Sequence, residues 1–135
     1  MSDWNEKIIA EFRAQGGQVG GQFAGAPLLL LHTVGARSGR PRVNPMMYQK
    51  LDGGYAVFAS KAGAPTSPDW YHNLLAHPRV RAEIGTDTVE LVARVTAGDE
   101  RERIWSAQKA AYPGFADYEQ QTTRQIPVVV LEPAP

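Results

Sequence analysis

Residues 28–60 decide the fold, and they read LLLLHTVGARSGRPRVNPMMYQKLDGGYAVFAS. Three apolar or alternating runs in this stretch predict strands over residues 28–33, 42–50 and 54–60. Turn residues separate the runs, first over residues 35–41 and then at the dipeptide Asp52-Gly53. Asp-Gly is a strong hairpin signal, because a type I′ turn needs a positive φ at both central positions. The stretch therefore predicts consecutive antiparallel strands.

The rest of the chain predicts three more strands, over residues 79–84, 88–95 and 126–131. Short helices are expected from the cap Ser67 to the dipeptide His77-Pro78, from the cap Thr96 to Pro113, and in one turn around 115–118. Six short strands, mostly in hairpins, do not suit a doubly wound parallel sheet. We therefore expect an α+β, mainly β fold, in which a small antiparallel barrel carries two or three short helices, because closure removes sheet edges.

The N-terminal segment, residues 1–15, is expected to form an amphipathic helix, since Ile8 and Phe12 repeat at helical spacing. Glycines at 16, 17, 20 and 21 then predict a mobile linker over residues 16–25. We expect the whole chain to form a single domain, with the barrel over residues 26–133. The helix has three interpretations: a lid, an element that touches a membrane, or a helix packed on the barrel.

Composition excludes several functional classes. The chain has 135 residues and no cysteine, which rules out disulfides, thiolate nucleophiles and cysteine-ligated metals. The longest apolar runs, 28–31 and 128–131, are far shorter than the ~20 residues that a membrane span requires. No signal-peptide pattern is present at the N-terminus, so we expect a cytoplasmic protein.

The charges are balanced overall but not locally. Fourteen basic and fourteen acidic residues give zero net charge, which argues against a nucleic-acid partner. Residues 36–61, however, have a net charge of +4. This stretch contains one acidic residue, Asp52, and five basic residues: Arg37, Arg40, Arg42, Lys50 and Lys61. The excess is consistent either with a solvated surface or with an anion site, where arginine forks and small residues in turns bind phosphate or carboxylate.

Several common catalytic motifs are absent. No Gly-x-Gly-x-x-Gly or phosphate-binding Gly-x-x-x-x-Gly-Lys-Ser occurs. His32, His72 and His77 lack metal-ligand spacing, so we expect no metal and interpret them as structural or surface residues. Ser38 lies in a hairpin turn rather than in the Gly-x-Ser-x-Gly elbow of serine hydrolases.

A set of motifs resembles one known family. The motifs are Thr-x-Gly-x-x-Ser-Gly-x-Pro-Arg-x-Asn-Pro from Thr33, Asp-Gly-Gly from Asp52, Ala-Ser-Lys-x-Gly from Ala59, Pro-x-Trp-Tyr-x-Asn-Leu from Pro68, His-Pro at 77, Tyr-Pro-x-Phe-x-x-Tyr from Tyr112, and Ile-Pro-Val-Val from Ile126. In order and spacing, from about residue 20 to 133, they resemble the deazaflavin-dependent nitroreductases of actinobacteria. The resemblance implies a split β-barrel like that of FMN-binding proteins.

The resemblance also implies coenzyme F420, a 5-deazaflavin whose phosphodiester and oligoglutamate tail carry negative charge. Residues implied to contact it lie in the two turns, the strand after the first turn, and the short helix. They are Arg37, Ser38, Arg40, Arg42, Asn44, Pro45, Ser60, Lys61, Gly63, Trp70 and Asn73. For Trp70 the alternative is ordinary helix packing, and for Asn73 it is helix capping.

The implied reaction is hydride transfer from F420H2 to an electron-poor acceptor: an enone or unsaturated lactone, a quinone, or a nitro compound. Such a reaction needs positioning rather than an acid–base pair. The proton that follows would come from solvent, Ser60, Tyr112 or Tyr118. The resemblance assigns Tyr112, Phe115 and Tyr118 to the wall of the substrate pocket, although an aromatic stripe at this spacing also suits a core.

Two other functions remain open at this stage: an FMN-dependent split-barrel oxidoreductase, and a deazaflavin-binding protein without turnover. Expected partners are a small-molecule hydride acceptor and no nucleic acid. A peripheral membrane contact through the N-terminal helix is the alternative to a purely cytoplasmic protein. We expect a monomer or a weak homodimer.

Overall fold

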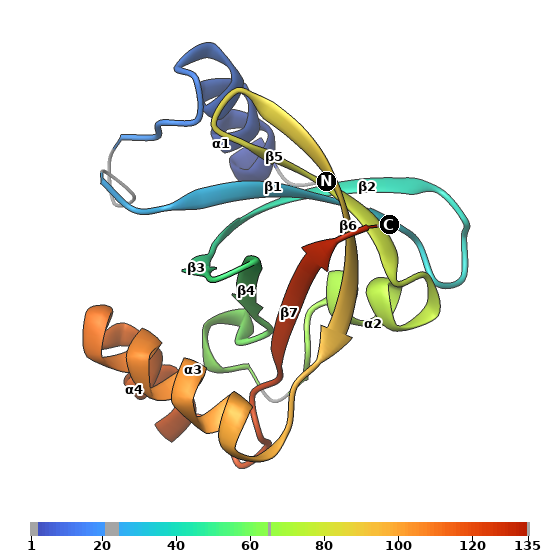
Figure 1. The fold of residues 1–135 in the computed structure, drawn as a ribbon. Coiled ribbons are helices and arrows are strands. Elements are labelled where there is room, and N and C mark those ends of the chain that lie inside the picture. The colour runs from blue at the N-terminus through green and yellow to red at the C-terminus, as the bar shows by residue number, and fades with distance from the viewer. Residues whose placement is uncertain (1–2, 21–24, 65, 135) are drawn as a thin grey trace.

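The computed structural model describes residues 3–20, 25–64 and 66–134. Its strands form one antiparallel sheet in the order β2-β1-β5-β6-β7-β4-β3 (Figure 1). The strands are β1 (Leu28–Val34), β2 (Pro41–Met47), β3 (Gln49–Leu51), β4 (Gly54–Phe58), β5 (Arg79–Ile84), β6 (Asp87–Val95) and β7 (Val128–Pro133). The sheet curls into a half-barrel, which confirms the predicted split antiparallel barrel.

The single strand predicted over residues 42–50 is wrong, because the structure divides it at Tyr48 into β2 and β3. As a result, seven strands replace the expected six among the described residues. β2 pairs with β1 at one edge of the sheet, and β3 pairs with β4 at the other. Tyr48 lies at the crossover, where its N–H donates to the carbonyl of Pro27 at 3.0 Å and extends the β1–β2 register by one residue. One continuous segment thus borders both edges of the curled sheet.

Five helical segments accompany the sheet in the described residues. They are α1 (Asp3–Ala14), a 3₁₀ turn η2 (Lys61–Gly63), α2 (Asp69–Ala76), α3 (Gly98–Ala111) and α4 (Gly114–Gln120). Neither predicted side-chain cap forms: Pro68 and Ala97 precede α2 and α3. The Thr96 hydroxyl instead donates to the carbonyl of Val128 at 2.9 Å, which fixes the start of β7.

The buried run at the start of β1 explains why Leu28 to Leu31 is continuously apolar. Leu29 and Leu31 face the barrel interior, where α2 contributes Trp70. Leu28 and Leu30 face the opposite side, where α1 covers them. A strand that is covered on both faces is apolar at successive positions, because neither of its faces is exposed to solvent.

α1 packs on the barrel, which supports the third of the three interpretations of this helix. Ile9 and Phe12 are buried against β1. Arg13 forms a two-pronged ion pair with Glu83 on β5, at 2.7 and 3.0 Å. The pKa of Glu83 is lowered from 4.5 to about 2, mainly by the hydrogen bond that it accepts from Arg13 and then by the one that it accepts from His32. Part of the predicted mobile linker, residues 21–24, lies outside the described residues. No described helix is long and apolar enough to span a membrane.

Candidate functional site

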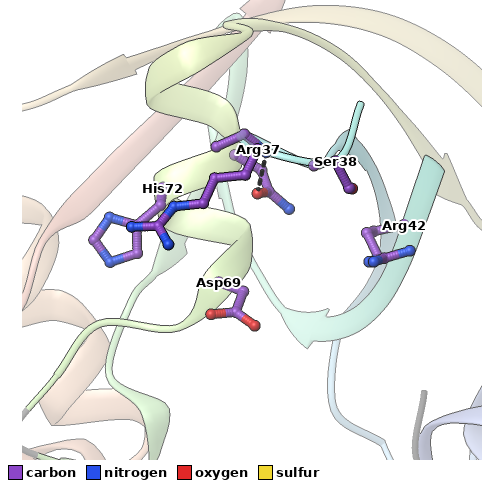
Figure 2. Close-up of a pocket in the computed structure, with 8 residues that line it drawn as sticks. Arg37, Ser38, Arg42, Asp69 and His72 are labelled. Carbon is purple, nitrogen blue, oxygen red and sulfur yellow. Dashed lines mark hydrogen bonds between the residues drawn. The ribbon is translucent and has the colours of Figure 1, made fainter. Parts of the chain in front are cut away.

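A pocket of about 620 Å³ lies where the β1–β2 turn faces α2 (Figure 2). Its walls come from the turn, the start of β2 and one side of the helix. The lining residues are Gly35, Ala36, Arg37, Ser38, Arg42, Asp69, His72 and Asn73. The volume falls within the roughly 300–1,000 Å³ typical of small-molecule sites.

The turn over residues 35–40 is closed by its own hydrogen bonds. The N–H of Gly35 donates to the carbonyl of Arg40 at 2.8 Å, and the N–H of Gly39 donates back to Gly35 at 3.0 Å. Gly39 has a φ of 70°, which favours glycine. A Cβ at Gly35 would overlap the hydroxyl of Ser38. Small residues are therefore required for the tight path of this turn.

Asn73 on α2 fastens the turn to the helix. Its Oδ1 accepts from the N–H of Ala36 at 2.9 Å, and its Nδ2 donates to the hydroxyl of Thr33 at 3.1 Å. Both Asn73 and Thr33 are buried. Asn73 thus sets the width of the pocket, and its side chain does not form the helix cap considered from the sequence.

Two unpaired guanidinium groups dominate the electrostatics of the pocket. Arg37 and Arg42 have no carboxylate partner among the described residues, and Figure 2 shows both at the pocket, with Arg37 directed toward His72. Arg13, Arg94 and Arg101 elsewhere all form ion pairs. The hydrogen bonds of the described residues also leave the peptide N–H groups of Arg37 and Ser38 unused. Asp69 at the rim offsets one positive charge. This donor set suits phosphate or carboxylate groups.

The second predicted turn, with Ser60, Lys61 and Gly63, follows β4 and does not line this pocket. Lys61 is exposed and has a φ of 47°, an unusual value for a residue other than glycine. A Cβ at Gly63 would be 2.8 Å from the side chain of Gln121 and 3.1 Å from the carbonyl of Tyr118, so the turn packs closely on α4. Ser60 is buried except for 8% of its surface.

Arg124, which the sequence did not single out, holds this second turn in place. Its guanidinium donates to the carbonyls of Ala59 (3.1 Å), Ser60 (2.9 Å) and Ala64 (3.0 Å). It also donates to the hydroxyl of Ser67 at 3.3 Å. One side chain therefore fixes both ends of the segment that carries Ser60 and Lys61.

The aromatic stripe lies on α4 and its approach, beside this turn. Phe115 is buried, and its ring contacts those of Phe58, Trp105 and Tyr118. Tyr112 and Tyr118 are half-buried, and their hydroxyls have no hydrogen-bond partner among the described residues. Phe115 is thus a core residue, whereas the two tyrosines border the surface.

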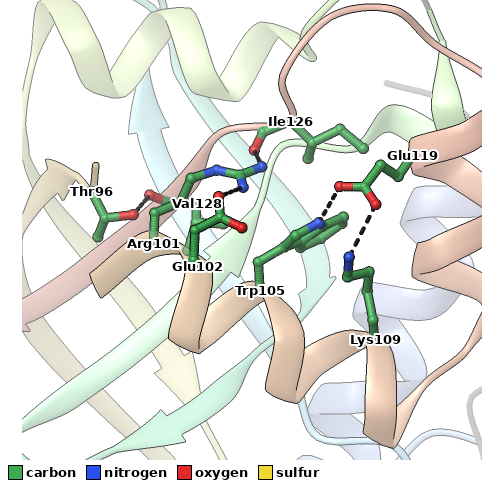
Figure 3. Close-up of polar contacts among 8 residues, drawn as sticks. All are labelled: Thr96, Arg101, Glu102, Trp105, Lys109, Glu119, Ile126 and Val128. Carbon is green, nitrogen blue, oxygen red and sulfur yellow. Dashed lines mark hydrogen bonds and ion pairs between the residues drawn. The ribbon is translucent and has the colours of Figure 1, made fainter. Parts of the chain in front are cut away.

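α3 supports this stripe through a polar network (Figure 3). The indole N–H of Trp105 donates to Glu119 on α4 at 2.5 Å, and Lys109 donates to the other carboxylate oxygen at 3.0 Å. Those contacts lower the pKa of Glu119, with the Trp105 hydrogen bond as the larger cause. Arg101 reaches from α3 to the carbonyl of Ile126 at 2.7 Å. α3 is therefore bonded both to α4, which carries part of the stripe, and to the segment before β7.

The remaining predicted residues lie around these two regions. Arg40 is exposed on the first turn but does not line the pocket, and Asn44 and Pro45 are half-buried on β2. Trp70 is buried in the barrel core. The structure therefore brings Arg37, Ser38, Arg42 and Asn73 into one pocket and places Ser60, Lys61, Gly63 and the aromatic residues in a second group. Sequence reasoning missed Asp69 and took His72 for a structural or surface residue. No described cluster of three or more His, Asp or Glu could hold a metal.

Comparisons with known proteins agree on one relationship. The family model described as F420H2-dependent quinone reductase matches residues 4–133. An F420H2-dependent quinone reductase from Mycobacterium tuberculosis is 36% identical over 144 residues, which covers 97% of this chain and 97% of that protein. Among solved structures, an F420H2-dependent reductase (FDR-A) is 41% identical with a TM-score of 0.72, covering 78% of this chain and 94% of that one. A domain-swapped dimer is 38% identical with a TM-score of 0.74, covering 94% and 92%.

Proposed function

Because the chain belongs to the F420H2-dependent quinone reductase family, we propose that it reduces quinones and similar electron-poor acceptors with hydride from F420H2. One observation carries the proposal: the pocket at the β1–β2 turn presents Arg37 and Arg42 without carboxylate partners. Unpaired arginines in a pocket of ligand size suit an anionic cofactor better than a neutral one.

The residues present fit the cofactor in their chemistry. Arg37 and Arg42 would bind the phosphodiester and the first carboxylates through charge-assisted hydrogen bonds. The hydroxyl of Ser38 and the unused peptide N–H groups at 37 and 38 add neutral donors to the same anion. Asn73 is already bonded to Ala36 and Thr33, so we assign it the role of positioning the turn.

The second group of residues would lie toward the reacting ring. Asn44 and Pro45 extend along β2 from Arg42, and we assign them to the ring side of the cofactor. Ser60, Lys61 and Gly63 would approach from the turn that Arg124 fixes. Trp70, which is buried in the barrel core, would pack against the cofactor from that side. The cofactor supplies the hydride, so the chain needs only to hold donor and acceptor in reacting geometry and exclude water.

A proton must follow the hydride, and three hydroxyls are candidates for supplying it. Tyr112 and Tyr118 have hydroxyls without partners among the described residues, and the hydroxyl of Ser60 is likewise unbonded there. A free hydroxyl at the surface of a site can donate to a substrate oxygen. Phe115 is buried and adds no hydroxyl to this group, so we propose quinones and unsaturated carbonyl compounds ahead of nitro compounds.

The direct test is anaerobic turnover, in which the purified protein is mixed with F420H2 and a soluble quinone such as menadione. We expect protein-dependent oxidation of F420H2 together with formation of the quinol. Oxidation supported by reduced FMN instead would favour the FMN-dependent alternative. Tight F420 binding with no turnover on quinone, enone or nitro acceptors would indicate a deazaflavin-binding protein that has no catalytic activity.

Assembly and location are part of the proposal. We propose a cytoplasmic monomer or weak homodimer, tested by sedimentation at several protein concentrations. A peripheral membrane contact through α1 would require apolar residues beyond Ile9 and Phe12, which already pack on β1. Co-sedimentation with anionic vesicles measures that contact.

A further inference from the structure

We propose that Asp69 is a specificity-determining residue, which biases the pocket at the β1–β2 turn toward phosphodiesters and against phosphomonoesters. The proposal rests on the proposed function, since it concerns the same pocket and the same cofactor. F420 carries a phosphodiester, whereas FMN ends in a phosphomonoester. A phosphodiester has one negative charge at pH 7, and a phosphomonoester has about 1.5 to 2.

Asp69 is the one carboxylate among the residues that line this pocket. It is the first residue of α2, and Figure 2 shows its side chain projecting from the start of that helix, with Arg37 and Arg42 on the elements beside it. The side chain is exposed and forms no ion pair with a described residue. It does not cap the helix either, because Pro68 precedes α2 and no side-chain cap is present. Its negative charge is therefore available to act on a ligand.

The position of Asp69 at the pocket is fixed by Asn73. The two residues are four apart on α2 and so lie on the same side of the helix. Asn73 is buried and bonds to the N–H of Ala36 at 2.9 Å and to the hydroxyl of Thr33 at 3.1 Å. Because these bonds hold α2 against the turn, the start of the helix cannot move away when an anion enters.

The charges of the pocket suit a single negative charge. Arg37 and Arg42 contribute two positive charges and Asp69 contributes one negative charge, with His72 counted as neutral. The attraction between this site and an anion grows in proportion to the charge of the anion, whereas the cost of removing the anion from water grows with the square of that charge. By lowering the net charge of the site, Asp69 moves the balance toward the singly charged ester.

The neutral donors of the pocket do not make this distinction. The hydroxyl of Ser38 and the unused peptide N–H groups at 37 and 38 can donate to the oxygens of either ester. Selection between two ligands that make the same attractive contacts requires a group that repels one of them more strongly. Among the lining residues only Asp69 carries the charge to do so.

The test compares two ligands without a glutamate tail, the deazaflavin 5′-monophosphate and its methyl ester. They share the ring and the sugar chain and differ by one methyl group and one charge. Their affinities are measured at pH 8 by displacement of oxidised F420, because the second pKa of a phosphomonoester is near 6. The wild type should bind the methyl ester more tightly. Asp69→Asn should shift the ratio of the two affinities roughly fivefold toward the monophosphate, and moderate salt should reduce that shift.

Two further variants separate the charge of Asp69 from its place at a helix start. Asp69→Glu keeps the charge and should keep the preference for the methyl ester. Asp99→Asn removes an exposed acid from the first turn of α3, outside the pocket, and should leave the ratio unchanged. Thermal unfolding should show that all three variants fold.

The possible failures distinguish this inference from the proposed function. A wild type that prefers the monophosphate, or a ratio that Asp69→Asn does not shift, would overturn the inference while F420 binding still supports the proposed function. A methyl ester that cannot displace F420 would also overturn it, because the pocket would then not bind the phosphate group. No binding of F420 itself would overturn both.

Discussion

Replacing Arg124 by methionine should both destabilise the protein and weaken its cofactor site. Methionine keeps most of the apolar length but removes four donors, three of which bond to main-chain carbonyls at 2.9 to 3.1 Å. A hydrogen bond from a charged donor contributes about 1.5–3 kcal/mol, and such bonds on one group are not additive. Because Arg124 is half-buried, some of the freed carbonyls will find water. We therefore expect a loss of about 3 kcal/mol in the free energy of unfolding.

Urea denaturation gives the stability change, and hydrogen exchange shows where it acts. Amide protection should fall first in residues 59–67, which contain all four acceptors of the Arg124 side chain. Arg124→Lys should recover about half of the loss, since an ammonium group cannot span the same acceptors. Arg103→Met, at an exposed arginine, should change stability by less than about 0.5 kcal/mol. A similarly small change for Arg124→Met, with protection of 59–67 intact, would refute the reasoning.

Three further perturbations test other parts of the structure. Asn73→Ala should cost about 2 kcal/mol, because it removes two hydrogen bonds at a buried position, and it should also lower F420 affinity; unchanged affinity would show that the turn is held without it. Tyr118→Phe should leave F420 affinity alone and slow quinone reduction, whereas identical steady-state kinetics would make the hydroxyl dispensable. Glu83→Gln should cost about 1–2 kcal/mol at pH 7, since the pKa of Glu83 is lowered to about 2 by the mainly exposed Arg13. That contribution is complete above about pH 4.5 and is lost as the pH falls toward 2, so the stability gap between wild type and variant should close over this interval; a gap that persists at pH 2 would assign the effect to packing instead.

Local patterns predicted most elements of the fold because the signals that define them are local. The hairpin turn at Asp52-Gly53, the apolar runs of β1 and β7, and the end of α2 before Pro78 all appear where the sequence indicates. The turn is not of type I′, however, because its φ is positive at Gly53 (87°) but not at Asp52. The division of the 42–50 strand was missed, because the pairing partner changes there, from β1 for β2 to β4 for β3. The periodicity of apolar residues predicts a strand but does not predict which other strand it pairs with.

The candidate site shows the same limit. A turn rich in arginine and glycine can be identified as an anion site from its composition, and Arg37, Ser38 and Arg42 do line one pocket. Arg124 could not be found in this way, since its side chain bonds to residues 57 to 65 positions away. In the sequence it is a single charge in a polar loop, which usually indicates a solvated residue.

The central claim is that the pocket formed by the β1–β2 turn and α2 binds F420. Paired calorimetric titrations with oxidised F420 and FMN, at low and at moderate salt, test it most directly when they are made on the wild type and on Arg37→Ala. We expect salt-sensitive F420 binding, negligible FMN binding, and a loss of about 1.5–3 kcal/mol in F420 affinity on removal of Arg37. Preference for FMN, or F420 affinity unchanged by Arg37→Ala, would contradict the assignment of this pocket.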